Sequence, residues 1–160
     1  MKFRFFLMYN ITASEKQVTA NERMNGMKKI RQIEGIGAAY CARLTEAGIV
    51  SVDQYLEACR TKKDRRALAR KTGIPDHLIL MWTNHADLFR VKGIGGQYAD
   101  LLEAAGVDTV RELAQRNPEN LVAAMEKLNE EKKLVRSVPS LKMVTKWVAE
   151  ARKLPYIVEY

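Results

Sequence analysis

Two stretches of the chain carry a Gly-Ile-Gly turn, a pattern that can bind an anion. Residues 33–52 and 91–110 are identical at eight positions when they are aligned at an offset of 58. A tight turn needs glycine where the backbone takes a positive φ or closely approaches another segment. The helix predicted after each turn begins with unpaired N–H groups, and these donors and the helix dipole favour a phosphate. The candidate contacts are Gly35, Ile36 and Gly37 in the first turn, and Lys92, Gly93, Ile94, Gly95, Gly96 and Gln97 in the second.

The residues that flank the two turns differ, and they favour the second turn as the phosphate site. Lys92 brings a positive charge to the second turn, and Gly96 leaves room for a ligand beside it. Glu34 precedes the first turn, where its negative charge would oppose a phosphate. We therefore expect the second turn to contact phosphate and the first turn to act mainly as a structural brace.

A run of basic residues forms the second candidate site. On a helix, Lys62, Arg66 and Arg70 share one face because they are spaced four residues apart. Such a run is either a solvated helix face or a patch that follows a phosphate backbone, and the spacing alone allows both. The candidate contacts in this run are Lys62, Arg65, Arg66 and Arg70. Arg60, Lys63 and Lys71 accompany them, and Asp64 is the acidic residue among them.

The charge of the chain favours a polyanionic partner. The 160 residues carry a net charge of +8, and residues 27–90 hold +5 of it (12 basic minus 7 acidic residues). A basic excess predicts affinity for polyanions but no specificity. No run reaches the ~20 apolar residues of a membrane span, so we expect no membrane partner and a cytoplasmic protein.

The cysteines and histidines do not predict a metal or cofactor site. Cys41 and Cys59 fall on apolar helix faces, where a cysteine behaves as a small buried hydrophobe. Together with His77 and His85 they match no familiar spacing of zinc ligands. The sequence therefore predicts neither a cofactor nor a metal.

The sequence predicts that all of these residues lie on helices or at their ends. Apolar stripes, glycine stops and Ser-x-x-Gln or Thr-x-x-Glu capping boxes at 51–54 and 109–112 recur in both halves of the chain. We expect helices over 28–33 and 62–71, and further helices that carry the stripes 40–47, 52–59, 78–89, 98–105, 121–128 and 141–151. Ile74-Pro75, Asn117-Pro118 and Val138-Pro139 open three of these, and the box at 109–112 opens another. Tyr40 and Tyr98 lie in the stripes, so core packing is expected of them rather than base stacking, and Trp82 and Trp147 are expected to anchor the two halves to each other.

The repeat sets the predicted organisation. We expect an all-α protein with a flexible leader over 1–26, a first helix-hairpin-helix unit over 27–90, a second over 91–154, and a tail over 155–160. Each unit has too few residues to bury a large core alone. The two duplicated units are therefore expected to pack with pseudo-twofold symmetry as one compact body.

The turns and stripes resemble the helix-hairpin-helix motif, whose small and apolar positions would be Cys41 with Leu44 and Ala99 with Leu102. The chain also resembles the bacterial family named domain of unknown function 4332 over about 27–154, through its Ile-Glu-Gly-Ile-Gly turn and Leu-x-x-Ala-Gly-Ile run. The motif implies phosphate contact by the turns. DNA-binding versions usually place lysine or arginine after the second glycine, whereas this chain has Ala38 and Gly96 there.

Two function classes follow from these observations. The first is a non-enzymatic, sequence-neutral module that binds double-stranded DNA or another polyanion. The second is a protein-interaction or scaffold module, similar to the helical domain that ends the bacterial RNA polymerase alpha subunit. Catalysis is not expected, because Asp108 directly follows a glycine stop and no nucleophile partners His77 or His85.

Overall fold

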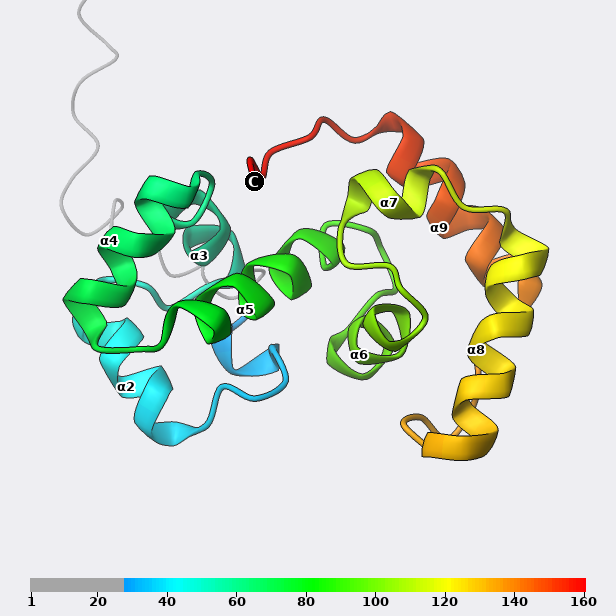
Figure 1. Ribbon diagram of the computed structural model, residues 1–160, viewed down its shortest axis with the longest axis horizontal. Coiled ribbons are helices and arrows are strands. Elements are labelled where there is room, and N and C mark those ends of the chain that lie inside the picture. Colours follow the sequence, from blue (N-terminus) through cyan, green and yellow to red (C-terminus); the bar gives the residue numbers. More distant parts are fainter. Residues whose placement is uncertain (1–27) are drawn as a thin grey trace, which may run out of the picture.

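A computed structural model describes residues 28–160, and this part of the chain is all-helical, as predicted (Figure 1). The predicted leader, residues 1–26, lies outside the described residues. The described part holds a short 3-10 helix, eight α-helices and no strand. The elements are η1 (Ile30–Gln32), α2 (Ala38–Glu46), α3 (Val52–Ala58), α4 (Lys62–Thr72), α5 (Asp76–Leu88), α6 (Gly96–Ala104), α7 (Val110–Ala114), α8 (Pro118–Lys132) and α9 (Leu141–Lys153).

Side-chain caps fix the starts of several helices. Ser51 accepts from the Gln54 N–H at 3.1 Å while Gln54 accepts from the Ser51 N–H at 3.3 Å, so the first predicted capping box is confirmed. Thr109 caps α7 through the Glu112 N–H, but Glu112 accepts from the Asp108 N–H at 2.6 Å rather than from Thr109. The second box is therefore shifted by one residue.

Each half builds its core around one tryptophan. Trp82 on α5 meets Tyr40 with ring centroids 5.2 Å apart, and its Nε1 lies 3.2 Å from where a Cβ on Gly35 would sit. Trp147 on α9 meets Tyr98 at 5.4 Å, and its Nε1 lies 3.2 Å from the corresponding point on Gly93. Each tryptophan therefore packs on the glycine turn and the tyrosine of its own half, and the expectation that the two tryptophans also anchor the halves to each other stays a prediction.

Helix α5 joins the two groups of helices. It packs against α3 and α4 in the first half and against α6 in the second, and Figure 1 shows it running between them. At its C-terminal end the buried Asp87 carboxylate accepts from the Val110 N–H at 2.9 Å. Buried apolar side chains from both halves form a single cluster.

The segment after α9 returns to the first half, as Figure 1 shows. The Glu159 N–H donates to the Arg60 carbonyl at 2.8 Å, and the Tyr160 hydroxyl donates to Asn84 Oδ1 at 2.7 Å. Residues 155–160, predicted as a tail, therefore contact the helices α3–α5.

Within residues 28–160, no helix combines the length and apolarity that crossing a membrane requires.

Candidate nucleic-acid interface

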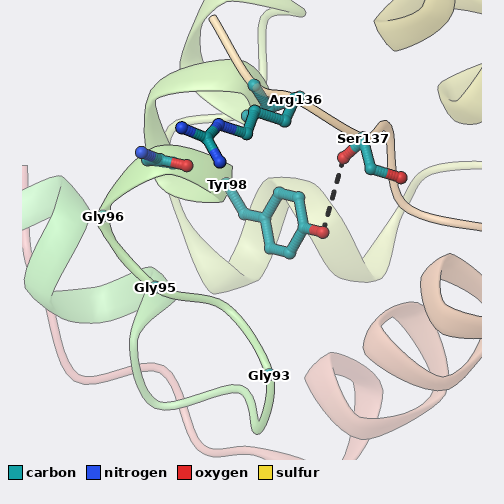
Figure 2. A pocket seen from close by; sticks show the side chains of 8 residues that line it. Gly93, Gly95, Gly96, Tyr98, Arg136 and Ser137 are labelled. Atoms are coloured by element: carbon teal, nitrogen blue, oxygen red, sulfur yellow. Dashed lines mark hydrogen bonds between the residues drawn. The ribbon is translucent and has the colours of Figure 1, made fainter.

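The second Gly-Ile-Gly turn opens into a hollow of about 470 Å³ (Figure 2). Gly93 has a φ of +94°, a conformation that favours glycine, and Gly95 is the N-cap of α6. No side chain caps α6, so the N–H groups of its first turn have no side-chain acceptor among the described residues. The hollow is lined by Gly93, Gly95, Gly96, Gln97, Tyr98, Val135, Arg136 and Ser137.

Arg136 brings a positive charge to this hollow from a distant part of the sequence. It lies in the connection between α8 and α9, next to the buried Val135. Asn129 holds that connection, because its side-chain amide donates to the Val135 carbonyl and accepts from the Val135 N–H, both at 2.9 Å. Figure 2 shows Gly93 and Gly95 below the Tyr98 ring and the Arg136 side chain above it. Arg136 thus supplies, from a distant part of the chain, the cation that the sequence lacks directly after the second glycine.

Gly96 has a packing role that the sequence did not indicate. A Cβ on Gly96 would lie 2.8 Å from the Gln32 carbonyl oxygen and 3.3 Å from Glu34 Oε1. The start of α6 therefore packs against the first turn region. Glu34, expected to oppose phosphate only at the first turn, places its carboxylate beside the second as well.

Of the other residues predicted at the second turn, two side chains are exposed and one is buried. Gln97 is exposed and lines the hollow. Lys92 is exposed but does not line the hollow, and its backbone N–H donates to Glu150 Oε1 at 3.2 Å. Ile94 is buried, so only its backbone is available to a ligand.

The first turn has the same backbone conformation as the second. Gly35 has a φ of +88°, and Gly37 is the N-cap of α2, which also lacks a side-chain cap. Ile36 is buried, like Ile94. No atom lies within 4 Å of the point where a Cβ on Gly37 would sit, so this turn faces open space.

Helix α4 carries a basic surface of five exposed side chains. Among the described residues none of them forms an ion pair. The five side chains are Lys62, Lys63, Arg66, Arg70 and Lys71, which we call the α4 basic surface.

Arg65 does not belong to this surface, although it was predicted as a contact. It is 7% exposed, and its guanidinium donates to the carbonyls of Cys59 at 3.0 Å, Arg60 at 3.3 Å and Glu159 at 2.8 Å. The Tyr160 ring also covers it, at 5.5 Å from the centroid. Arg65 is therefore a structural residue that holds the returning 155–160 segment.

Two members of the α4 basic surface line a second hollow, of about 460 Å³. Arg66 and Arg70 form one wall, and the start of α5 at Pro75 and Asp76 forms another. Helix α5 has no side-chain cap, so the positive end of its dipole lies in this hollow. The Asp76 carboxylate in the first turn offsets part of that charge.

The two candidate sites lie in different halves of the molecule. Helix α4 packs on the N-terminal part of α5, whereas α6 meets its C-terminal part through His85 and Glu103. Figure 1 shows α4 and α6 on either side of α5. The structure therefore does not merge the second turn and the basic helix into one pocket.

Tyr40 and Tyr98 are partly buried and pack against the core, as predicted. The Tyr98 hydroxyl also donates to the Ser137 carbonyl at 3.5 Å, which Figure 2 shows. Each ring also meets the tryptophan of its own half, which favours core packing over base stacking.

A separate polar cluster lies where α5 meets α6. His85 Nε2 lies 2.7 Å from Glu103 Oε2 and 3.6 Å from Asp100 Oδ1. Partial burial raises the pKa of Asp100; His85 lowers it, and the Glu34 and Glu103 carboxylates raise it further. Within residues 28–160, these three side chains form a group that could hold a metal ion. The sequence analysis missed them because His85 and the two carboxylates lie 15 and 18 residues apart on different helices.

The family model described as "Domain of unknown function (DUF4332)" matches residues 34–154. The chain belongs to the DUF4332 family. The match spans both Gly-Ile-Gly turns and helices α2 to α9, and the DUF4332 resemblance predicted from the sequence is thereby confirmed. Comparison with curated proteins gives no match, and neither does comparison with solved structures.

Proposed function

We propose that this DUF4332 chain is a non-enzymatic module that binds double-stranded DNA without reading its sequence. The α4 basic surface supplies most of the attraction, and the hollow at the second turn holds a further phosphate. Contacts of this kind position a protein on the DNA backbone but carry no sequence information.

The observation that carries the proposal is the α4 basic surface. Five exposed cations lie on one 11-residue helix, and none is neutralised by a carboxylate among the described residues. Exposed cations of this density release counterions when they meet a phosphate backbone. Arg66 and Arg70 also share a hollow with the uncapped start of α5, which suits a single phosphate group.

The second turn supports the same function through its uncapped N–H groups and Arg136. An arginine beside free backbone donors provides charge-assisted hydrogen bonds to a phosphate oxygen. The Glu34 carboxylate weakens this site, because it lies near the start of α6. We therefore assign the larger share of binding to α4.

We also propose that the chain is a tandem of two helix-hairpin-helix units that arose by duplication and keep pseudo-twofold symmetry. The matching geometry supports this: Gly35 and Gly93 both have φ near +90°, and each lies under the indole nitrogen of its own tryptophan. The two tyrosine–tryptophan pairs have centroid distances of 5.2 and 5.4 Å.

Charge reversal on α4 tests the DNA-binding proposal. In fluorescence anisotropy with a labelled duplex at 50 mM salt, Arg66→Glu/Arg70→Glu is expected to weaken binding by roughly tenfold or more. The matched control is Lys127→Glu/Lys153→Glu, which removes the same charge from exposed positions on α8 and α9. Equal weakening in both variants would show that net charge, rather than the α4 basic surface, determines binding.

A second pair of variants tests the turn. Gly95→Glu places a carboxylate in the hollow, and Gly37→Glu makes the same change at the first turn. Both positions leave open space for a side chain, and a glutamate is compatible with a helix N-terminus. Gly95→Glu is expected to weaken DNA binding more than Gly37→Glu, with circular dichroism unchanged in both.

The alternative function is a protein-interaction or scaffold module. It is favoured by the close packing of Gly96 against Gln32, which shows the turns in contact with each other. It is also favoured by Leu134 and Leu141, which are large apolar side chains exposed at 37% and 44%. Absence of duplex binding at 50 mM salt would favour this alternative.

A further inference from the structure

We propose that His85, Asp100 and Glu103 form a binding site for one divalent transition-metal ion, with Zn²⁺ as the reference ion. The site lies at the junction of α5 and α6. A metal bound there would link the first half of the molecule to the second. It is separate from the α4 basic surface and does not depend on nucleic-acid binding.

The geometry of the three side chains fits one ion. Their ligand atoms all lie within 4.8 Å of one another. In a tetrahedral zinc site with bonds of about 2.0–2.2 Å, ligand atoms lie about 3.3–3.6 Å apart. The 3.6 Å between His85 Nε2 and Asp100 Oδ1 already has this value, and the 2.7 Å to Glu103 Oε2 must widen by less than about 1 Å.

A buried imidazole, and not surface acidity alone, defines the site. The His85 side chain is 2% exposed, and its Nε2 points at the two carboxylates. The Asp100 and Glu103 side chains are 37% and 39% exposed. The exposed carboxylates give an ion a path from solvent and the freedom to adjust their positions, while α5 holds the imidazole fixed.

The charges around the site call for a cation. Asp100 and Glu103 form no ion pair with a lysine or arginine in the part of the chain that the structure describes. Glu34 lies close enough to act on Asp100 electrostatically. Among the described residues, the one basic group within ion-pair distance of these carboxylates is the His85 imidazole.

The unpartnered His85 Nδ1 bears on which cation fits. Nδ1 is buried without a hydrogen-bond partner among the described residues. Both an imidazolium and an imidazole that binds metal through Nε2 carry a proton on Nδ1, so the same unpaired N–H is buried in each. A proton brings one positive charge to the two carboxylates, whereas a divalent metal brings two. The divalent ion therefore compensates the cluster more fully.

The ligand types point to the metal class. Imidazole favours zinc, copper, iron and nickel, whereas a site of carboxylates alone favours magnesium, calcium or manganese. One imidazole and two carboxylates leave a fourth position of a zinc site to water.

Titration of the full chain with ZnCl₂ by calorimetry tests the site. Wild type is expected to bind one ion, and saturating Zn²⁺ should raise the melting temperature by roughly 5–10 °C. Asp100→Asn and Glu103→Gln should each weaken binding by at least about tenfold. Both changes are at partly exposed positions, so these variants are expected to fold whether or not His85→Gln does.

Two controls separate this site from adventitious binding. Glu126→Gln makes the same carboxylate-to-amide change at an exposed position on α8 and should leave binding unchanged. Cys41→Ala removes the partly exposed thiol and should also leave it unchanged. Undiminished binding in Asp100→Asn and Glu103→Gln would overturn the proposal, as would wild type that binds no Zn²⁺ at 100 µM.

Discussion

Single residues on α4 show how one basic run serves two purposes. Arg65 points inward and holds three carbonyls, whereas Arg66 next to it is exposed and lines a hollow. The sequence contained a signal for this difference, because Arg65 lies one turn before the apolar Leu68 and so shares its buried face. The basic character of the run obscured that signal in the sequence analysis.

Alanine substitutions at these neighbours are expected to have different effects. Arg65→Ala should lower the free energy of unfolding by about 2–4 kcal/mol, because it leaves buried carbonyl groups unpaired. Arg66→Ala should change it by no more than about 0.5 kcal/mol and should weaken DNA binding instead. Urea denaturation of both variants measures the first effect, and similar stability losses would contradict the assignment.

The two cysteines should differ in reactivity. Burial, the largest cause, raises the pKa of the Cys59 thiol from 9.0 to about 11, and its side chain is fully buried. Since the thiolate is the reactive form, native Cys59 should resist iodoacetamide at pH 8 and become reactive only as the pH approaches 11. Cys41 is partly exposed and should be modified first. Mass spectrometry of the native protein at several pH values tests this, and early labelling of Cys59 would contradict its buried position.

The helices could be predicted well where local signals define them. The α4 helix was expected over 62–71 and spans Lys62–Thr72, and glycine stops end α2 and α6 close to the predicted places. The predicted helix over 28–33 is only the single turn of η1, because the Gly35 turn and the Ser51 contact draw the backbone into an extended form. Helix α9 starts at Leu141 rather than at Pro139, since Ser140 provides its cap.

Contacts between elements were less predictable, and Arg136 is the clearest case. It lines the same hollow as the second turn although it lies about 40 residues later in the sequence. Local periodicity cannot predict such a contact. The contact of Gly96 with Gln32 was equally hidden, since the sequence suggested only that Gly96 left room for a ligand.

The contact of α6 with the first turn region leads to a stability prediction. Helix propensity alone would favour Gly96→Ala by roughly 0.5–1 kcal/mol. The added Cβ would meet the Gln32 carbonyl at 2.8 Å, however, and a backbone atom cannot easily yield. We expect a net loss of about 1–2 kcal/mol in the free energy of unfolding.

The neighbouring variant Gly95→Ser is the control for this prediction. It adds a larger side chain at an open position and supplies a favourable N-cap, so it should be neutral or stabilising. A Gly96→Ala variant as stable as Gly95→Ser would show that α6 and the first turn region are not in close contact. Both values come from the same chemical denaturation experiment.

The arrangement of the whole molecule follows from α5. Apolar stripes on the sequence indicate which faces are buried, but they do not say which element covers them. Trp82 and Trp147, which were expected to join the two halves, each cover the turn of their own half. The halves meet at the C-terminal end of α5 and where the start of α6 packs against the first turn region, and residues 155–160 add a further connection.

The length of α5 also sets the scale of the proposed interface. Its 13 residues span about 20 Å, a length equal to about six base pairs of DNA. A duplex longer than this exceeds α4 in length and can meet the α4 basic surface, whose five exposed cations can each contact a phosphate. Binding should then depend on several phosphates and respond steeply to salt.

The salt dependence of duplex binding is the most direct test of this account. With wild type and a labelled duplex, the dissociation constant is measured between 50 and 200 mM salt. Neutralising about four to six phosphates predicts a log–log slope of roughly −4 to −5, reduced by about two in Arg66→Glu/Arg70→Glu. A slope near zero, or no binding at 50 mM salt, would contradict the proposed DNA-binding function.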